Sequence, residues 1–210
     1  MMALPLLALF LARPALAEPS TLLAFGVSLT QGYGLPEGDG CVPQLETWLK
    51  DHGADVKVIN GGVSGDTTAG GAGRIAWSLS PDVDAVLVAL GGNDMLRGID
   101  PASSRENLDT ILSEIQSRHL PVLLVGMTAP GNFGDAYKTQ FDALYPELAQ
   151  QHDVALFDQF MAGLIALGDR QKVIRDYLQS DAIHPNAEGV SLIVAQMGPK
   201  ILQFLAEMKP

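Results

Sequence analysis

Short, nearly continuous apolar runs alternate along this chain with stretches whose apolar residues recur every three or four positions. A continuous apolar run is typical of a strand buried on both faces, whereas the longer period is typical of an amphipathic helix. The runs predict five strands, at residues 22–26, 55–60, 83–90, 121–127 and 154–157. The helical spacing predicts helices at residues 42–52, 69–79, 103–118, 136–152 (bent or interrupted near Pro146) and 187–208, with a short helix within 160–178.

Strands that alternate with helices form βαβ units, which pair as a parallel sheet through right-handed crossovers. The pattern therefore predicts an α/β fold, a three-layer α/β/α sandwich around a central five-stranded parallel sheet. No repeat or linker interrupts it, so we expect residues 18–210 to form a single domain. The carboxyl ends of all the strands then share one edge, where the loops that follow them converge.

Composition and charge narrow the classes of partner. The 210 residues are 47% apolar and 18% charged, which is typical of a globular domain. The formal net charge of -11 argues against a nucleic-acid partner and against electrostatic docking on anionic lipid. Cys41 is the only cysteine, which excludes an intramolecular disulfide and a cysteine-based zinc site. We interpret Cys41 as a packing residue.

The first seventeen residues have the pattern of a signal peptide. An apolar run at 3–12 is followed by Ala15-Leu16-Ala17, which matches the small-x-small pattern of a signal-peptidase site, so the mature chain is expected to begin at Glu18. The run is too short to span a bilayer as a helix. Met1-Met2-Ala3 lacks the usual opening Lys or Arg, which leaves a misassigned start codon or an apolar N-terminal helix as alternatives.

Five residues of suitable chemistry fall where the sheet edge brings loops together. Ser28 follows the first strand, Gly65 the second and Asn93 the third, while Asp181 and His184 precede the last helix. A hydroxyl needs an adjacent base to act as a nucleophile, and a carboxylate can orient that base. The amides of Ser28, Gly65 and Asn93 could stabilise a developing oxyanion. The set predicts an acyl-transfer site.

Each of these residues alone also has an ordinary structural interpretation. Serines at strand ends commonly satisfy backbone groups, and an Asn-Asp pair such as Asn93-Asp94 commonly forms a turn. His184 alone could be a hydrogen-bonded loop histidine, and Asp181 a turn former. The prediction therefore rests on the combination.

The combination resembles the GDSL/SGNH hydrolases, and within them the bacterial periplasmic branch of arylesterases and multifunctional thioesterase/lysophospholipases. The resemblance covers the whole mature chain. It lies in a nucleophile block at Phe25–Thr30, a glycine block at Asn60–Thr67, an asparagine block at Leu90–Asp94 and an Asp-x-x-His block at Asp181–Asn186.

The resemblance implies an SGNH hydrolase fold of the flavodoxin-like type and a serine esterase that acts through an acyl-enzyme. Ser28 would be the nucleophile, His184 the base and Asp181 its orienter, with Ser28, Gly65 and Asn93 forming the oxyanion hole. The expected substrates are small-molecule aryl or short-to-medium acyl esters, with thioesters and lysophospholipids as further candidates. No metal or cofactor is implied, and the expected location is the periplasm or the medium.

One position departs from the family pattern, because Val27 stands where the nucleophile block carries aspartate. Valine cannot accept hydrogen bonds, and a buried donor left unpaired costs about 1–3 kcal/mol. The alternative is therefore a catalytically impaired relative that still binds acyl ligands. A carbohydrate-ester deacetylase is a third hypothesis, because fold does not determine the substrate. The small apolar loops 32–36 and 127–134 suit a shallow acyl or aryl cleft, or are ordinary Gly/Pro loops.

Overall fold

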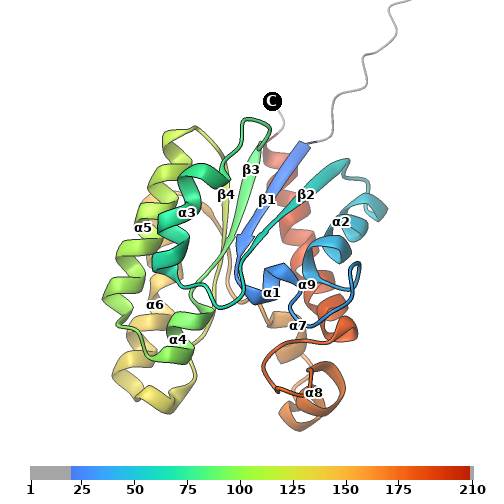
Figure 1. The fold of residues 1–210 in the computed structure, drawn as a ribbon, viewed down its shortest axis with the longest axis vertical. Helices are drawn as coiled ribbons and strands as arrows, with labels where there is room; N and C mark the ends of the chain where they lie inside the picture. The colour runs from blue at the N-terminus through green and yellow to red at the C-terminus, as the bar shows by residue number, and fades with distance from the viewer. Residues whose placement is uncertain (1–19, 209–210) are drawn as a thin grey trace, which may run out of the picture.

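A computed structural model describes residues 20–208 and arranges them around a five-stranded parallel sheet in the order β2-β1-β3-β4-β5 (Figure 1). The expected α/β class and five-stranded parallel sheet are confirmed, and the strand order is that of flavodoxin-like folds. The predicted signal peptide lies outside the described residues. The strands are β1 (Ser20–Gly26), β2 (Val56–Gly62), β3 (Ala85–Ala89), β4 (Val122–Val125) and β5 (Ala155–Phe157).

Helices cover both faces of the sheet, with α2, α7 and α9 on one side and α3, α5 and α6 on the other (Figure 1). The shorter elements α1, α4, α7 and α8 gather at the carboxyl ends of the strands, the lower edge in Figure 1. The helices are α1 (Ser28–Gln31), α2 (Cys41–Asp51), α3 (Thr68–Ser78), α4 (Gly92–Arg97), α5 (Pro101–Ser117), the 3₁₀ helix η1 (Gly131–Phe133), α6 (Asp135–His152), α7 (Ala162–Ile165), α8 (Arg170–Tyr177) and α9 (Ala187–Glu207).

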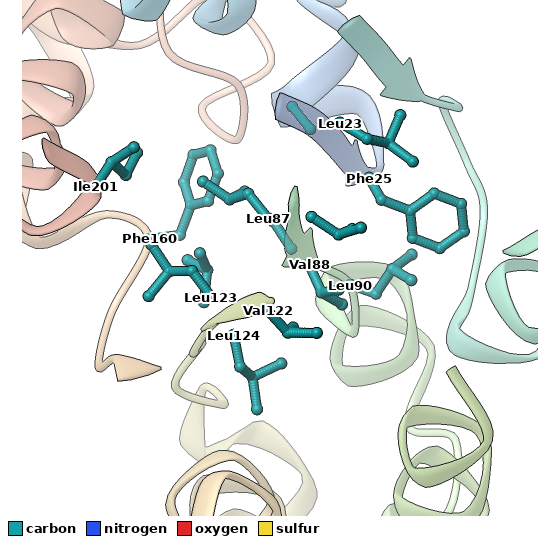
Figure 2. Close-up of a cluster of buried hydrophobic side chains, with 14 of the residues drawn as sticks. Leu23, Phe25, Leu87, Val88, Leu90, Val122, Leu123, Leu124, Phe160 and Ile201 are labelled. Carbon is teal, nitrogen blue, oxygen red and sulfur yellow. The ribbon is translucent and has the colours of Figure 1, made fainter. Parts of the chain in front are cut away.

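The apolar runs are buried because helices pack on both faces of each central strand. All five residues of β3 and all four of β4 are buried. Figure 2 shows Leu87 and Leu123 on the side of Phe160 and Ile201, with Leu124 on the opposite side of the sheet. This alternation divides one continuous run between two helical layers, so its residues are apolar whichever face they point to.

The structure corrects several local expectations. Ser28, which follows the first strand, is the first residue of α1, and the pair Asn93-Asp94, whose composition suggests a turn, lies within α4. Helix α6 continues through Pro146 without a break, because its buried residues, including Leu144 and Leu148, hold it against the core and outweigh the lost hydrogen bond. The loop expected at 127–134 contains η1.

Cys41 is buried within the core. Burial raises the pKa of the Cys41 thiol to about 12, so the thiol stays protonated, which confirms its interpretation as a packing residue.

Helix α9 is long and apolar enough to cross a membrane by length and composition, with a mean hydropathy of 1.3. Half of that stretch is buried, where α9 packs against α2 and α7, as expected for a core helix.

Candidate active site

The nucleophile candidate sits at the junction of β1 and α1, at the carboxyl edge of the sheet. Val27 is the N-cap residue of α1 and has extended backbone angles, so it continues the strand direction for one residue before the helix begins at Ser28. Helix α1 lasts a single turn and ends at Gly32, whose φ of 85° is readily adopted only by glycine. Ser28 is 8% exposed, so its hydroxyl is held in one place yet faces the cavity described below.

A continuous chain of hydrogen bonds joins Ser28, His184 and Asp181. The Oδ2 atom of Asp181 lies 2.6 Å from Nδ1 of His184, and Nε2 of His184 lies 2.8 Å from Oγ of Ser28. A carboxylate only accepts, so Nδ1 carries the proton of a neutral imidazole, and Nε2 is then free to accept from the Ser28 hydroxyl. This tautomer is the one that a general base needs.

The loop that carries Asp181 and His184 is closed by its own hydrogen bonds. Oδ1 of Asp181 accepts from the backbone N–H groups of Ile183 and His184, at 2.9 and 3.0 Å. Partial burial raises the pKa of Asp181, but these bonds and the one from the His184 ring outweigh it and hold the pKa at about 2. The carboxylate therefore stays ionised at neutral pH. The tight loop places Ala182 in the left-handed region, with φ 57°.

Gln179 anchors this loop and was missed by the sequence analysis. Its backbone N–H donates to the His184 carbonyl at 2.7 Å, and its side-chain amide donates to the carbonyls of Tyr33 and Pro185. The ring of Tyr33 lies against the His184 ring, with centroids 4.8 Å apart. Gln179 thus links the loop that carries Asp181 and His184, called the base loop below, to Tyr33 in the segment that follows Ser28. A glutamine that bonds only backbone carbonyls carries no motif, so the sequence offered no signal for it.

Three groups at this edge are candidate donors to an oxyanion: the backbone amides of Ser28 and Gly65 and the side-chain amide of Asn93. Among the described residues, the backbone N–H groups of Ser28 and Gly65 have no hydrogen-bond acceptor. The side-chain amide of Asn93 donates one N–H to the Asp66 carbonyl at 2.7 Å, which orients the group and leaves its second N–H available. Gly65 has φ 78°, and its carbonyl accepts from Arg97 at 2.9 Å. The structure thus brings the five predicted site residues to one edge.

A buried ion pair supports the strand ends beneath the site. Arg74 of α3 donates to Asp66 at 2.7 Å, and the two side chains are only 10% and 13% exposed. Its remaining donors reach the carbonyls of Gly26 and Gly61, at the ends of β1 and β2, and its guanidinium lies 3.9 Å from the centre of the Phe25 ring. Arg74 therefore ties together the two strands that present Ser28 and Gly65. The only sequence signal was an arginine within an otherwise apolar helix.

Asp94 holds the start of α4 in place through buried hydrogen bonds. The sequence alone suggested only that Asn93-Asp94 forms a turn. Asp94 is 1% exposed and accepts from the backbone N–H and hydroxyl of Thr68 and from the hydroxyl of Ser104. These contacts fix the start of α4 against α3 and α5. They also hold the backbone of its neighbour Asn93.

Val27 leaves α1 without a side-chain cap. No side chain accepts a hydrogen bond at this N-terminus, whereas Asp, Asn, Ser and Thr usually do so. Within the described residues, Thr30 Oγ1 is a buried side-chain oxygen without a hydrogen-bond partner. The Val27 side chain is 2% exposed and lies near Gly92 and Met127, where it forms part of an apolar wall. The departure from the family pattern thus changes both the cap and the wall.

An apolar cavity of about 370 Å³ opens beside Ser28 and His184. Of the loops expected to form a cleft, 127–134 contributes Met127 and Thr128, whereas Tyr33 of 32–36 contributes only its contact with His184. The remaining wall comes from the edge of the sheet and from α4 and α7: Val27, Leu29, Gly92, Asn93, Met95, Leu96, Gln159, Phe160, Met161, Ile165 and Ile183.

Within residues 20–208, no group of three or more His, Cys, Asp or Glu side chains is placed to hold a metal ion. The groups gathered at Ser28 are a hydroxyl, a base oriented by a carboxylate, and candidate N–H donors. That set suits attack on a polarised carbonyl carbon.

The chain is similar to known esterases and thioesterases along most of its length. A 33% identical arylesterase from Vibrio mimicus matches over 201 residues, 95% of this chain and 97% of that protein. The thioesterase 1/protease 1/lysophospholipase L1 of Escherichia coli (strain K12) is 33% identical over 201 residues, 94% of this chain and 91% of that protein. The crystal structure of AlinE4, an SGNH-hydrolase family esterase, superposes with a TM-score of 0.73 at 43% identity, covering 93% of this chain and all of that one.

The model of the GDSL-like lipase/acylhydrolase family matches residues 24–192 and so spans the strand before Ser28 through to the start of α9. The family expected from the four blocks is confirmed. This chain belongs to the GDSL-like lipase/acylhydrolase family and is a hydrolase of the esterase type.

Proposed function

We propose that this protein is a serine esterase that hydrolyses aryl or short-to-medium acyl esters through an acyl-enzyme on Ser28, with thioesters and lysophospholipids as further substrates. The observation that carries the proposal is the hydrogen-bonded sequence from Asp181 through His184 to the Ser28 hydroxyl. The named activities of the arylesterase and thioesterase relatives support the same substrate classes.

In the first half of the reaction, His184 Nε2 takes the proton of the Ser28 hydroxyl as its oxygen attacks the ester carbonyl. The carbonyl oxygen becomes an oxyanion that accepts from the amides of Ser28, Gly65 and Asn93. Each such donor contributes about 10²–10³-fold to the rate. Asp181 stays ionised and stabilises the imidazolium. His184 then gives its proton to the leaving oxygen or sulfur, and the acyl group remains on Ser28.

In the second half, a water molecule takes the place of the leaving group. His184 removes a proton from this water, whose oxygen attacks the acyl carbon. The tetrahedral intermediate collapses, the Ser28 oxygen recovers the proton from His184, and the carboxylic acid leaves. Both halves use the same base and the same N–H donors. The proton taken from water at the end replaces the one given to the leaving group, so the enzyme returns to its starting state.

The direct test is labelling with a fluorophosphonate followed by peptide mass spectrometry. We expect the adduct on Ser28, together with loss of p-nitrophenyl ester turnover. Ser28→Ala should abolish both, whereas Ser64→Ala, which removes another hydroxyl at the same edge, should keep both. An adduct on a different residue, or full turnover by Ser28→Ala, contradicts the proposal.

The uncapped α1 favours the second candidate, a catalytically impaired acyl-binding protein. A panel of p-nitrophenyl esters of graded acyl length separates the esterase from the acyl-binding protein. No turnover of any p-nitrophenyl ester by the purified protein, with tight binding of a fatty acid, would select the binding protein.

Export completes the proposal. Cleavage after Ala17 would release a chain that begins at Glu18 into the periplasm or the medium, as a single domain. N-terminal sequencing of protein from the periplasmic fraction should find Glu18 first. Intact Met1 in the cytoplasmic fraction would contradict export.

A further inference from the structure

Gln31, the last residue of α1, has a side chain that the mechanism above does not use. Its Oε1 accepts a hydrogen bond from the backbone N–H of Ser64 at 3.1 Å and another from the Ser64 hydroxyl. Ser64 immediately precedes Gly65, whose backbone N–H is a candidate oxyanion donor. One carboxamide thus connects the helix that begins at Ser28 to the residue beside the second donor.

Residues 63–66, called the oxyanion turn here, form a type II turn. The Asp66 N–H donates to the Val63 carbonyl at 3.2 Å. Gly65, the third residue, has φ 78°, and Ser64 before it has a negative φ, which is the type II combination. The turn therefore holds its own shape, but its placement relative to α1 depends on contacts from outside.

The contacts that place the oxyanion turn come from both sides. On one side, Arg97 of α4 donates to the Gly65 carbonyl at 2.9 Å. On the other side, the ladder between β1 and β2 ends where the Val63 N–H donates to the Gly26 carbonyl at 3.1 Å. Beyond that bond, no backbone hydrogen bond in the described chain joins the turn to α1. The side chain of Gln31 makes this connection.

The other side chains of α1 do not share this task. The Ser28 hydroxyl bonds His184, Leu29 is apolar, and Thr30 Oγ1 is buried without a partner among the described residues. The helix also begins without a side-chain cap. Gln31 is therefore the residue whose side chain ties α1 to the oxyanion turn.

The backbone of Gln31 is itself held closely against the end of β2. Its carbonyl accepts from the Asn60 side-chain amide at 3.2 Å. A Cβ on Gly62 would lie 2.3 Å from the Gln31 nitrogen, so only a glycine allows this approach. The carboxamide thus extends from a fixed point of the main chain.

We propose that Gln31 is a positioning residue of the oxyanion hole, which fixes the spacing between the N–H groups of Ser28 and Gly65 by holding the oxyanion turn against α1. The inference rests on the proposed esterase function and adds a residue to it. Gln31 acts through Ser64 and contacts no reacting atom. Because the oxyanion develops only as the reaction proceeds, this spacing affects kcat more than KM.

The test is Gln31→Met, which keeps the length of the side chain and removes its acceptor. We expect kcat for p-nitrophenyl butyrate to fall about tenfold with little change in KM, since loss of a whole donor costs about 10²–10³-fold and here the donor is only displaced. Gln151→Met is the matched control, because the same substitution breaks an exposed bond to Asp109 of α5. It should leave both constants unchanged.

Ser64→Ala sharpens the assignment. It keeps the backbone N–H that bonds Gln31, so the turn stays attached and kcat should fall much less than in Gln31→Met. All rates are measured well below Tm and per active site titrated with a fluorophosphonate, which removes any effect of unfolded protein. An unchanged kcat in Gln31→Met, or a raised KM with unchanged kcat, overturns the proposal.

NMR relaxation of the backbone amides separates this inference from the proposed function, because it needs no substrate. We expect a lower order parameter or a shifted resonance for the Gly65 amide in Gln31→Met, and neither in Gln151→Met. If the wild-type protein hydrolyses no ester, the proposed function fails, and the Gly65 amide alone decides whether Gln31 holds the turn. An unchanged Gly65 amide in Gln31→Met overturns the inference.

Discussion

The base loop, which carries Asp181 and His184, and the nucleophile turn, residues 26–28, are joined by the hydrogen bond between His184 and Ser28. The two segments are held in place in opposite ways. In the base loop, Asp181 bonds three groups of its near neighbours, and Gln179 closes the loop through the His184 carbonyl. The nucleophile turn has no side-chain cap of its own. Its support comes from far along the chain, chiefly from Arg74, which bonds the Gly26 carbonyl.

This difference predicts how substitutions in each half of the site affect activity and stability. The base loop contains most of its own bonds, so a change inside it disturbs chemistry more than folding. The nucleophile turn depends on the sheet and on α3, so changes beneath it affect stability and the aim of Ser28 together. Four predictions test this contrast.

The largest expected effect is the loss of kcat on substitution of His184 in the base loop. His184→Ala removes the group that activates Ser28, and loss of a base in such a unit lowers kcat by about 10⁴–10⁶-fold. Asp181→Ala should lose less, because the neighbouring backbone bonds and Pro185 still orient the ring in part. Steady-state kinetics measures both, and an unchanged Tm in His184→Ala would show that the loss is chemical. Comparable activity in His184→Ala and wild type contradicts the role of His184.

The next effect concerns the support of the nucleophile turn. Arg74→Met leaves the buried Asp66 carboxylate unpaired and deprives two carbonyls of their donor, which should lower the free energy of unfolding by about 3–5 kcal/mol. Urea denaturation measures the loss. Arg105→Met breaks the exposed pair with Glu147 and should cost under about 1 kcal/mol. Equal losses in the two variants would show that burial of the Arg74 pair carries no special weight.

Val27→Asp tests whether the nucleophile turn is held too loosely. A carboxylate at the N-cap can accept from the first amides of α1, which should improve the aim of Ser28 and raise kcat by tens-fold with little change in KM. Measurements of kcat and Tm give the answer. Val27→Thr, similar in shape but a weaker cap, is the matched control.

Two results would contradict this expectation. Lower Tm without a gain in kcat would mean that the apolar wall around Val27 has adapted to valine, since a buried carboxylate without partners is costly. No turnover in either protein, with fatty-acid binding retained, would favour the acyl-binding alternative.

The smallest effect is the pH dependence of the base loop. The pKa of Asp181 is lowered in the folded protein from its ordinary value of 3.8 to about 2. Its carboxylate therefore stabilises the fold above about pH 4, and this contribution is lost as the pH falls through about 2. Asp181→Asn lacks this contribution, so the deficit in its free energy of unfolding, measured by urea denaturation as a function of pH, should shrink on acidification. The change should be under about 1 kcal/mol because the carboxylate is exposed. A deficit that is constant with pH would contradict the assignment.

The fold followed from the sequence because both faces of the central strands are covered. Runs such as 83–90 are apolar throughout, and alternation with amphipathic helices leaves a parallel sheet as the simple solution. Boundaries were less predictable. Gly91-Gly92-Asn93-Asp94 has the composition of a turn, yet Asp94 and its buried partners begin α4 there. Short helices depend on such tertiary contacts more than on local propensity.

The candidate site residues could be named from the sequence because their chemistry recurs as short blocks, and in the structure Ser28, His184 and Asp181 are joined by hydrogen bonds. Their supports could not. Arg74 and Gln179 bond backbone carbonyls, which every residue possesses, so no partner residue marks the pairing in the sequence.

The bond between Ser28 and His184 also fixes when during biosynthesis the protein can become reactive. The two residues are 156 positions apart, and His184 precedes α9, which must dock on α2 and α7. A chain is synthesised from its N-terminus, so Ser28 emerges early and remains an ordinary hydroxyl while most of the protein is made. Activation then coincides with docking of the last helix, and an incomplete chain has no activated serine with which to attack the esters around it.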